Sequence, residues 1–459
     1  MKGTGDEEME TGEKDTDVRI FSNRDIKKLI IPLIMEQALA ITVGMADTMM
    51  ISSVGEAAVS GVSLVDMFNN FIISMLAALA TGGAVVTSQF IGASRREEAC
   101  RSARQLLWVN AVITIIISVL VIAGHRLILN LFFGKIEADV MQNAITYLII
   151  SAISFPFLAV YNACAALFRS MGNSRITLKV SILMNIINVG GNAICVFGLK
   201  MGVAGVAVPS LISRAVASFI LYVLLKNPEN LIHLSKERFR FEWKVAKKIL
   251  HIGIPSGIEN GIFQLGRVVV VSIIAGFGTA QIAANGVANS LDSMGCIVGQ
   301  GMNLAMITVI GQCVGAGDLA QVRYYTKKLL LITYAATAVI NSLILLFLHP
   351  VLALYGLGEE ATGLAYILVM IHDGMAMLLW PASFVLPNML RACNDVKYTM
   401  VTAIFSMVTF RIGLSLVFGV HMGMGAIGVW AAMVVDWIFR VCCFVGRYFR
   451  GTWRRHCNL

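Results

Sequence analysis

Long apolar runs separated by short polar breaks dominate this sequence. Residues 106–123, 327–348 and 397–420 are examples, and a helix needs roughly 20 predominantly apolar residues to cross a hydrocarbon core about 30 Å thick. The pattern predicts an all-α, polytopic membrane protein. Its twelve predicted transmembrane helices are residues 27–52, 57–92, 95–124, 138–168, 174–198, 203–226, 243–276, 280–315, 318–348, 360–390, 396–419 and 425–448.

The composition excludes an ordinary soluble protein. Of the 459 residues, 57% are hydrophobic and 14% are charged, with a mean hydropathy of +0.78, whereas soluble domains carry about 25% charged residues. The net charge of +9 comes from basic residues in short loops, a pattern of membrane orientation rather than nucleic-acid binding. The nine cysteines include no C-x-x-C pair, so we interpret them as core residues without disulfides or metal.

The loop charges predict the orientation of the chain. With the N-terminus on the cytoplasmic side, the inward loops hold 27 Lys and Arg residues, and the outward loops hold Arg126, Lys135 and Lys200. Cytoplasmic loops carry the excess of basic residues in membrane proteins. We therefore expect both termini to be cytoplasmic.

The chain repeats itself after 223 positions. Matching segments keep the same polar and glycine residues, namely Glu36 with Glu259, "QFIGAS" (89–94) with "QCVGAG" (312–317) and, with a slip of one residue, "LFRSMGN" (167–173) with "MLRACND" (389–395). Six helices per repeat is an even number, so both halves enter the membrane from the same side. We expect two homologous six-helix bundles, related by a pseudo-two-fold axis along the membrane normal, around a central cavity.

These features divide the chain into five predicted parts. They are a disordered cytoplasmic N-terminus (1–24), an N-lobe (25–226), a cytoplasmic linker (227–242), a C-lobe (243–450) and a cytoplasmic tail (451–459). Residues 1–24 are polar and acidic, a composition typical of disorder. Internal duplication across twelve helices indicates transport by alternating access.

Asp47 is the most informative polar residue, because ionisable groups within membrane helices are rare and usually functional. Its repeat partner is Val270, so the shared architecture does not require it. Asn188 and Asn192 lie at a matching depth, and Asn185 shares their helical face. A carboxylate with amide oxygens binds Na⁺ or holds a proton. Alternatively, these groups simply join two helices by hydrogen bonds.

Two further pairs are candidates for the wall of a substrate cavity. One acid and one amide, three positions apart, occur at the same place in both halves, Asp66 with Asn69 and Asn289 with Asp292. Residues three apart share a helical face. Either the pairs line the cavity or they anchor helix packing.

Other acids are candidates for the same wall. The symmetric Glu36 and Glu259 either contact backbone groups at a proline kink or flank the cavity, with Gln264 nearby. Asp373 follows His372 in a Met- and Trp-rich stretch, which suits a cationic aromatic ligand, although such stretches more often serve ordinary packing.

The ionisable residues within the predicted helices favour a cationic ligand. Seven acids face four bases, namely Glu36, Asp47, Asp66, Glu259, Asp292, Asp373 and Asp436 against Arg214, Arg267, Arg411 and Arg440. A net acidic interior attracts cations. We expect Asp436 and Arg440 to pair along their helix, and the other three arginines to pair with acids on neighbouring helices.

Motifs for hydrolysis and nucleotide binding are absent from the sequence. It contains no H-E-x-x-H, no G-x-S-x-G and no G-x-x-x-x-G-K-[ST]. We therefore expect no enzyme activity and no cofactor, and we expect an ion gradient to supply the energy for transport.

Three short motifs occur together in this chain. They are "DT" near the end of the first predicted helix, "Q-x-x-G-A" after the second and eighth, and "R-x-x-G-N" after the fourth. With them, residues 25–450 resemble the multidrug and toxic compound extrusion (MATE) family, particularly its bacterial members. The resemblance implies two six-helix lobes in a V, exporting organic cations in exchange for Na⁺ or H⁺. It also implies that Asp47 couples the cation, with Asn188 and Asn192 beside it.

Departures from the family pattern favour coupling in the N-lobe. Phe263 occupies the place where some Na⁺-coupled members carry an acid on the seventh helix. Asp373 lies about two turns from the acid expected on the tenth helix. The sixth helix offers Ser210 and Arg214 where some relatives have an acid. We therefore expect coupling through Asp47.

The leading expectation is a monomeric antiporter in the bacterial cytoplasmic membrane. Its partners are the lipid bilayer and a small, cationic, amphipathic cargo, without nucleic acid, and the sequence leaves Na⁺ and H⁺ open as coupling ions. One alternative is a flippase for a lipid-linked saccharide, which crowding of Arg214, Arg267 and Arg411 on the cavity wall would favour. The other is a non-transporting membrane receptor or assembly protein, against which the repeat argues.

Overall fold

The computed structural model describes residues 19–134, 137–234 and 239–457. Within these ranges, twelve helical segments are long and apolar enough to cross a membrane, which confirms the predicted fold class. Residues 1–18, most of the predicted disordered terminus, lie outside the described residues, as do the last two residues of the predicted tail.

The first half contains six long helices and one short one. They are α1 (Asn23–Ser52), α2 (Glu56–Gly92), α3 (Arg96–Ala123), the short α4 (His125–Phe133), α5 (Ala138–Ser170), α6 (Ser174–Ala193) and α7 (Ala204–Leu225). A π-helical turn, Ile194–Gly198, extends α6. The long helices correspond to the six predicted spans, and α4 is an addition that follows α3.

The second half follows the same order with more interruptions. Its helices are α8 (Trp243–Ala275), α9 (Thr279–Gly295), α10 (Ile297–Gly315), α11 (Leu319–Leu346), the short α12 (Leu348–Leu354), α13 (Glu359–Trp380), α14 (Leu386–Ala392), α15 (Val396–Ser406) and α16 (Gly425–Arg450). π-Helical turns at Pro381–Val385 join α13 to α14, and those at Met407–Gly413 and Ser415–His421 extend α15.

The predicted helix 280–315 is divided in the structure. α9 ends at Gly295, and α10 begins at Ile297. At the break, Asn341 of α11 donates from Nδ2 to the carbonyl oxygen of Gly295 at 3.4 Å. A neighbouring helix therefore supplies a partner for backbone that a continuous helix would satisfy itself.

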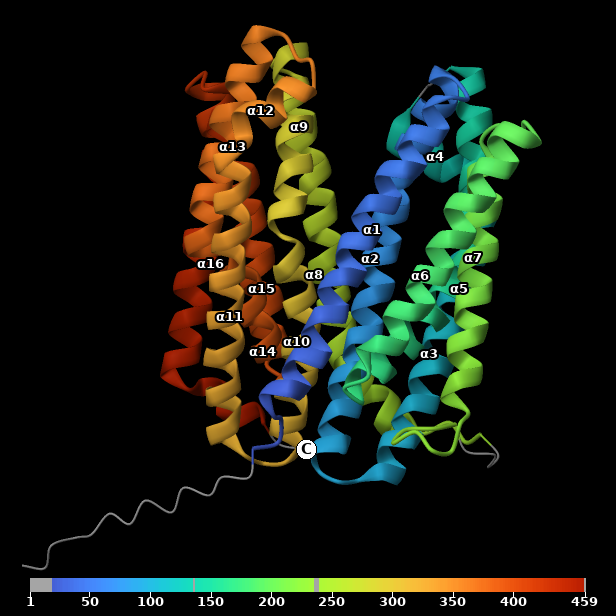
Figure 1. The fold of residues 1–459 in the computed structure, drawn as a ribbon, viewed down its shortest axis with the longest axis vertical. Helices are drawn as coiled ribbons and strands as arrows, with labels where there is room; N and C mark the ends of the chain where they lie inside the picture. The colour runs from blue at the N-terminus through green and yellow to red at the C-terminus, as the bar shows by residue number, and fades with distance from the viewer. Residues whose placement is uncertain (1–18, 135–136, 235–238, 458–459) are drawn as a thin grey trace, which may run out of the picture.

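The helices form two bundles that meet at one end of the molecule and separate toward the other (Figure 1). α2–α7 belong to the N-lobe, and α9–α16 belong to the C-lobe. α1 packs on α6 of the N-lobe and on α10 of the C-lobe, while α8 packs on α2 and on α15. The first helix of each half therefore crosses between the lobes. We call the end with the C-terminus and the start of α1 the closed end, and the opposite end the open end.

Glycines allow the two lobes to approach closely at the closed end. A Cβ on Gly92 would overlap the carbonyl oxygen of Gln312, and a Cβ on Gly315 would overlap that of Gln89. These two contacts are related by the repeat. The glycine of the Q-x-x-G-A motif is therefore required where α2 and α10 cross.

The glutamines of the same motif hold the opposite lobe. Gln89 donates from Nε2 to the carbonyl oxygen of Ala392 at 2.9 Å, and Gln312 donates to that of Ser170 at 2.7 Å. Both acceptors lie at the carboxyl ends of helices, where carbonyl groups lack intrahelical partners. In both halves, the motif therefore joins one lobe to the other at the closed end.

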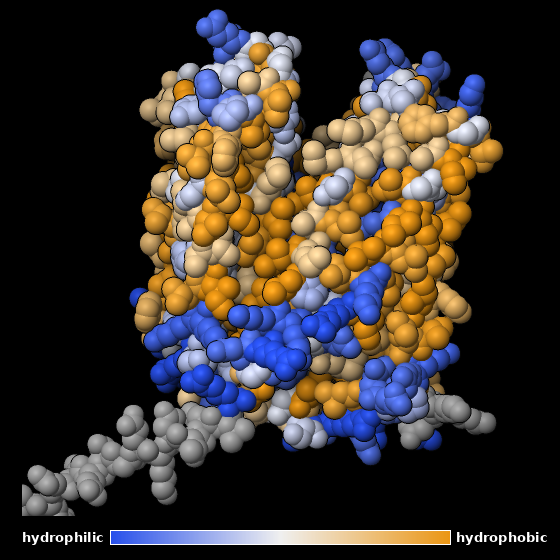
Figure 2. Space-filling view, in the orientation of Figure 1, coloured by the Kyte–Doolittle hydropathy of each residue, from blue (hydrophilic) through white to orange (hydrophobic). Residues whose placement is uncertain are grey.

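The surface of the protein also differs between the closed end and the open end. Apolar residues cover much of the body, hydrophilic residues gather at the closed end, and a hollow separates the lobes at the open end (Figure 2). Arg24, Lys27, Lys28 and Arg175 line one pocket on the surface near the start of α1. The closed end carries basic residues of the kind predicted to be cytoplasmic.

Residues 19–24 belong to the folded protein, contrary to their assignment to a disordered terminus. Ile20 donates its backbone N–H to Gln321 at 3.0 Å, and the Tyr325 hydroxyl donates to the carbonyl oxygen of Phe21 at 2.7 Å. Both partners lie on α11. The start of the chain is therefore fastened to the C-lobe before α1 begins.

The linker 227–242 is fastened to the N-lobe where the structure describes it. The guanidinium of Arg96 donates to the carbonyl oxygens of Pro228, Asn230 and Leu231 at 2.9–3.2 Å. These bonds hold the linker beside the start of α3.

Candidate functional site

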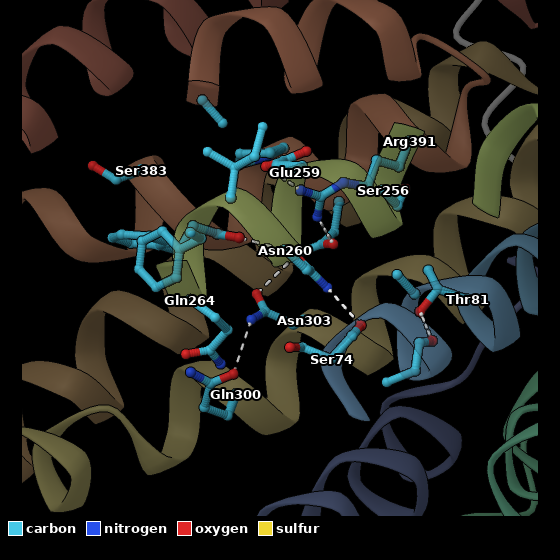
Figure 3. A pocket seen from close by; sticks show the side chains of 18 of the residues that line it. Ser74, Thr81, Ser256, Glu259, Asn260, Gln264, Gln300, Asn303, Ser383 and Arg391 are labelled. Atoms are coloured by element: carbon cyan, nitrogen blue, oxygen red, sulfur yellow. Dashed lines mark hydrogen bonds and ion pairs between the residues drawn. The ribbon is translucent and has the colours of Figure 1, made fainter. Parts of the chain in front are cut away.

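A cavity between the lobes combines aromatic walls with amide side chains. Two adjoining pockets of about 370 and 390 Å³ share Gln37, Phe263, Arg267, Gln300, Trp380 and Phe384. Asn260, Gln264, Gln300 and Asn303 lie together on one side of this space (Figure 3). Apolar walls with a few polar groups are typical of sites for small organic molecules. The predicted cavity residue Gln264 lines it.

Asp47 and two of the three predicted asparagines form a chain of hydrogen bonds in the N-lobe. Asn192 on α6 donates from Nδ2 to Asp47 Oδ1 on α1 at 2.7 Å and approaches Asn188 Oδ1 at 3.4 Å. Asn188 in turn donates to Ser210 Oγ on α7 at 2.8 Å. The cluster therefore joins three helices, and it leaves the buried Oδ1 of Asn192 without a partner.

Asp66 extends this N-lobe cluster. It lies on α2 in the neighbourhood of Tyr147, Asn69, Asp47 and Arg214. Neither Asp66 nor Asn69 lines the two central pockets. The burial of Asn69 fits the second alternative, in which the pair anchors helix packing within the lobe.

Asn185 stands apart from the cluster. Its Nδ2 lies 3.5 Å from Ser181 Oγ of its own helix. Sequence reasoning missed Tyr147 as a neighbour of the N-lobe cluster, and it named Ser210 only as the residue found where some relatives have an acid. Ser210 and Arg214 are four positions apart and so share a face of α7. This spacing could have indicated from the sequence that Ser210 faces the same cluster as Arg214.

Glu36 and Glu259 form equivalent ion pairs in the two lobes. Arg169 donates from Nη2 to Glu36 at 2.6 Å, and Arg391 donates from Nη2 to Glu259 at 2.6 Å. These arginines come from the R-x-x-G-N motif and its repeat. Both side chains lie inside the protein, where the sequence predicted seven acids and four bases. With them the count is seven to six, so the excess of acid nearly disappears.

These ion pairs also revise the cavity assignments. Glu259 lines the cavity, whereas Glu36 lies outside the two central pockets. Each glutamate side chain has an exposed fraction of 9%. A buried carboxylate that is already paired serves the frame of its lobe.

The C-lobe holds a histidine between two carboxylates. His372 Nε2 lies 2.6 Å from Asp292 Oδ1, and His372 Nδ1 lies 2.8 Å from Asp373 Oδ1. Asp292 lines the cavity together with Asn289, and its side chain is 23% exposed. Asp373 is fully buried behind the imidazole, which corrects its assignment to the cavity wall.

Three side chains with metal-ligating atoms meet at the same place. Donor atoms of Asp292, Cys296 and His372 all lie within 4.8 Å of one another. Oxygen, sulfur and nitrogen ligands suit divalent transition metals. However, the 2.6 Å contact between His372 and Asp292 already joins two of these groups directly.

The arginines of the C-lobe are unequally paired. Asp436 accepts from Arg440 Nε at 3.1 Å, which confirms that predicted pair, and it lies 3.6 Å from Arg411 Nη1. Arg267 lines both central pockets, and no acidic group lies within 4.0 Å of it among the described residues. In the N-lobe, Arg214 donates to Ser154 Oγ at 2.7 Å.

Two related bundles of six spans, closed together at one end around a polar and aromatic cavity, define a membrane transporter. The MatE family model matches residues 32–194 and again 255–417, so the second match begins 223 positions after the first. The chain belongs to this family, the multidrug and toxic compound extrusion transporters.

Relatives and solved structures agree with this membership. The chain is 27% identical over 415 residues to an uncharacterised transporter, YisQ, of Bacillus subtilis, covering 89% of this chain and 90% of that one. It is 25% identical over 446 residues to a probable multidrug resistance protein, NorM, of Thermotoga maritima, covering 95% and 94%. A solved MOP superfamily transporter from Pyrococcus furiosus has the same fold, with a TM-score of 0.87 at 19% identity over 94% of this chain and 96% of that one.

Proposed function

We propose that this protein is a secondary active antiporter that exports amphipathic organic cations across the bacterial cytoplasmic membrane in exchange for Na⁺ or H⁺. The observation that carries the proposal is the setting of Asp47. It lies near the open end of α1, Asn192 donates to it at 2.7 Å, and no basic group lies within 4.0 Å among the described residues. A carboxylate with a neutral partner remains available to a cation or a proton.

α1 connects this site to the contact between the lobes. Its outer part packs on α6, where Asn192 holds Asp47, and its inner part packs on α10, where Ile34 lies against Gly301. An ion at Asp47 replaces the hydrogen bond from Asn192. The packing of α1 on α6 of the N-lobe therefore changes. The change then reaches the closed end through the same helix, and cargo affinity changes with the favoured state.

The cavity supports an amphipathic cargo with a positive group. Phe263, Trp380 and Phe384 supply aromatic faces, which attract organic cations. Asp292 supplies a partly exposed carboxylate on the same wall. The amide side chains offer hydrogen bonds without a fixed charge, which suits cargo of varied structure.

The test of this proposal uses purified protein in liposomes. A fluorescent organic cation is loaded on the side that the closed end faces, a Na⁺ or H⁺ gradient is imposed, and efflux is recorded. We expect wild type to export the dye under one gradient and Asp47→Asn to lose that export while unfolding at the same temperature. Full export by Asp47→Asn would contradict the proposal. Asn185→Ala is the matched control, because Asn185 lies outside the cluster.

A flippase for lipid-linked saccharides is the second candidate, and one observation favours it. Arg267 and Arg411 line the same pocket of the cavity, where they would attract phosphate. Arg214 lies in the N-lobe cluster instead. Scrambling of a lipid-linked saccharide by proteoliposomes that export no organic cation would favour the flippase.

A further inference from the structure

We infer that the C-lobe wall of the cavity contains a subsite for an anionic group of the cargo, a carboxylate or a phosphate, formed by Arg267 and Arg411. The inference rests on the proposed export of small organic molecules and names the preferred class more closely. Such cargo is zwitterionic, with an acidic group as well as a positive one.

Arg267 is the exposed half of the subsite. It projects from α8 into the region shared by both central pockets, and it is exposed. Within the described residues no carboxylate lies within 4.0 Å of its guanidinium. Arginines inside membrane spans usually pair with an acid or a backbone carbonyl. An arginine that faces a cavity without such a partner is available to a ligand.

Arg411 is the buried half of the subsite. Its side chain is 13% exposed, and its Nε is buried without a hydrogen-bond partner. The carboxylate of Asp436 is shared, because Arg440 donates to it at 3.1 Å and Ser406 donates to the same oxygen. Arg411 approaches the other oxygen at 3.6 Å. Two guanidinium groups therefore face one carboxylate, which leaves positive charge on this wall.

The neighbouring carboxylates bind other basic groups, and one of those groups, His372, is shared by Asp292 and Asp373. Glu259 is already paired with Arg391 at 2.6 Å. Asp292, which lines the same pocket as both arginines of the subsite, is bound to His372 at 2.6 Å. The wall thus offers a guanidinium region and a separate carboxylate within one cavity.

The shape of the wall fits a flat amphipathic molecule between these charges. The guanidinium of Arg411 lies 5.8 Å from the centre of the Phe263 ring, and Trp380 stacks on Phe384 at 5.0 Å. Planar guanidinium groups bind carboxylate and phosphate through paired hydrogen bonds. An aromatic zwitterion would place its acid at the arginines, its ring against the aromatic residues and its cation near Asp292.

The test compares two ligands that differ in one charge. A rhodamine with a free benzoate is a zwitterion, and its methyl ester is a cation of nearly the same shape. Dye anisotropy gives the affinity of each for purified protein in nanodiscs. Because a hydrogen bond to a charged group contributes about 1.5–3 kcal/mol, we expect wild type to bind the acid at least about tenfold more tightly than the ester.

Substitutions at the exposed arginine make the comparison specific. Arg267→Gln is expected to bind acid and ester alike, Arg267→Lys to keep part of the preference, and Arg267→Glu to prefer the ester. Arg126→Gln removes the same charge from an exposed position on α4 and is expected to keep the wild-type preference. Unfolding temperatures confirm that each variant is folded.

The outcomes separate the subsite from the proposed function. Equal binding of both dyes to wild type, or a preference that survives in Arg267→Gln, would overturn the subsite. Gradient-driven export of the ester without preference for the acid would overturn the subsite alone. A preference for the acid without export under any gradient would support the subsite and overturn the antiporter. Displacement of the acid by a prenyl diphosphate would support the subsite and assign it to a lipid phosphate.

Discussion

The two lobes share one architecture but provide different partners for their carboxylates. In the C-lobe, five described carboxylates face a basic side chain at 3.1 Å or less, namely Glu259 with Arg391, Asp436 with Arg440, Asp292 and Asp373 with His372, and Asp395 with Arg447. In the N-lobe, Glu36 follows the same rule with Arg169. Asp47 and Asp66 do not, because no basic group lies within 4.0 Å of either among the described residues, and the close partner of Asp47 is the neutral amide of Asn192.

This difference separates the shared frame from the proposed ion site. The pairs Glu36–Arg169 and Glu259–Arg391 are equivalent under the repeat, so both halves use them to build the same structure. Asp47 has Val270 as its counterpart and belongs to one lobe. A neutral donor contributes about 1 kcal/mol to such a contact, so an ion displaces it far more easily than a buried guanidinium.

The largest effect is expected when the equivalent ion pairs are broken. Glu36→Gln leaves Arg169 buried without its partner, and Glu259→Gln does the same to Arg391, at a cost of about 3–5 kcal/mol in unfolding free energy. We expect both variants to lower the unfolding temperature in detergent by similar amounts. The double variant Glu36→Gln/Arg169→Gln recovers much of the loss. A large effect in one lobe alone would break the equivalence.

A smaller effect is expected at the closed end. Gly92→Ala and Gly315→Ala each place a methyl group against a backbone carbonyl of the other lobe, and overpacking of this kind costs about 1–3 kcal/mol. We expect both to lengthen spin-label distances across the closed end. Gly446→Ala is the matched control, because a Cβ there meets no atom within 4 Å. Unchanged distances in both variants would mean that these crossings do not hold the lobes together.

The smallest effect is expected when the hydrogen bond from Asn192 to Asp47 is removed. Asn192→Ala removes the donor to Asp47, whereas Asn185→Ala removes an amide of the same helix that bonds elsewhere. A net contribution of about 1 kcal/mol predicts a shift of about fivefold in the ion concentration for half-maximal efflux. We expect that shift in Asn192→Ala alone. The same shift in Asn185→Ala would point to general loosening of α6.

The sequence predicted the frame well because the frame is repetitive. Helix lengths, loop charges and the shift of 223 positions all report the same two-lobe arrangement. The matching depths of Asp47 and Asn192 follow from counting positions back from the ends of their helices, which works because α1 and α6 run in the same direction through a layer of fixed thickness. Depth along a helix is therefore readable without a structure.

Partners across helices were harder to predict. Arg169 and Arg391 fall just after the predicted helices 138–168 and 360–390, whereas both lie in the last turns of their helices and reach acids on other helices. The role of Asp373 depended on rotation, because His372 stands between it and Asp292. A sequence gives the depth of such side chains but not which neighbour each one meets.

The central claim is that the coupling ion binds at Asp47 in the N-lobe, and cargo-driven ion movement tests it most directly. Proteoliposomes with no imposed ion gradient receive a cargo gradient, and internal Na⁺ and pH dyes record which ion moves in exchange. Linkage requires cargo and ion to drive one another. We expect ion movement in wild type and in His372→Gln, with none in Asp47→Asn. Ion movement in Asp47→Asn, or its loss in a folded His372→Gln, would contradict coupling at Asp47 and place the ion site in the C-lobe.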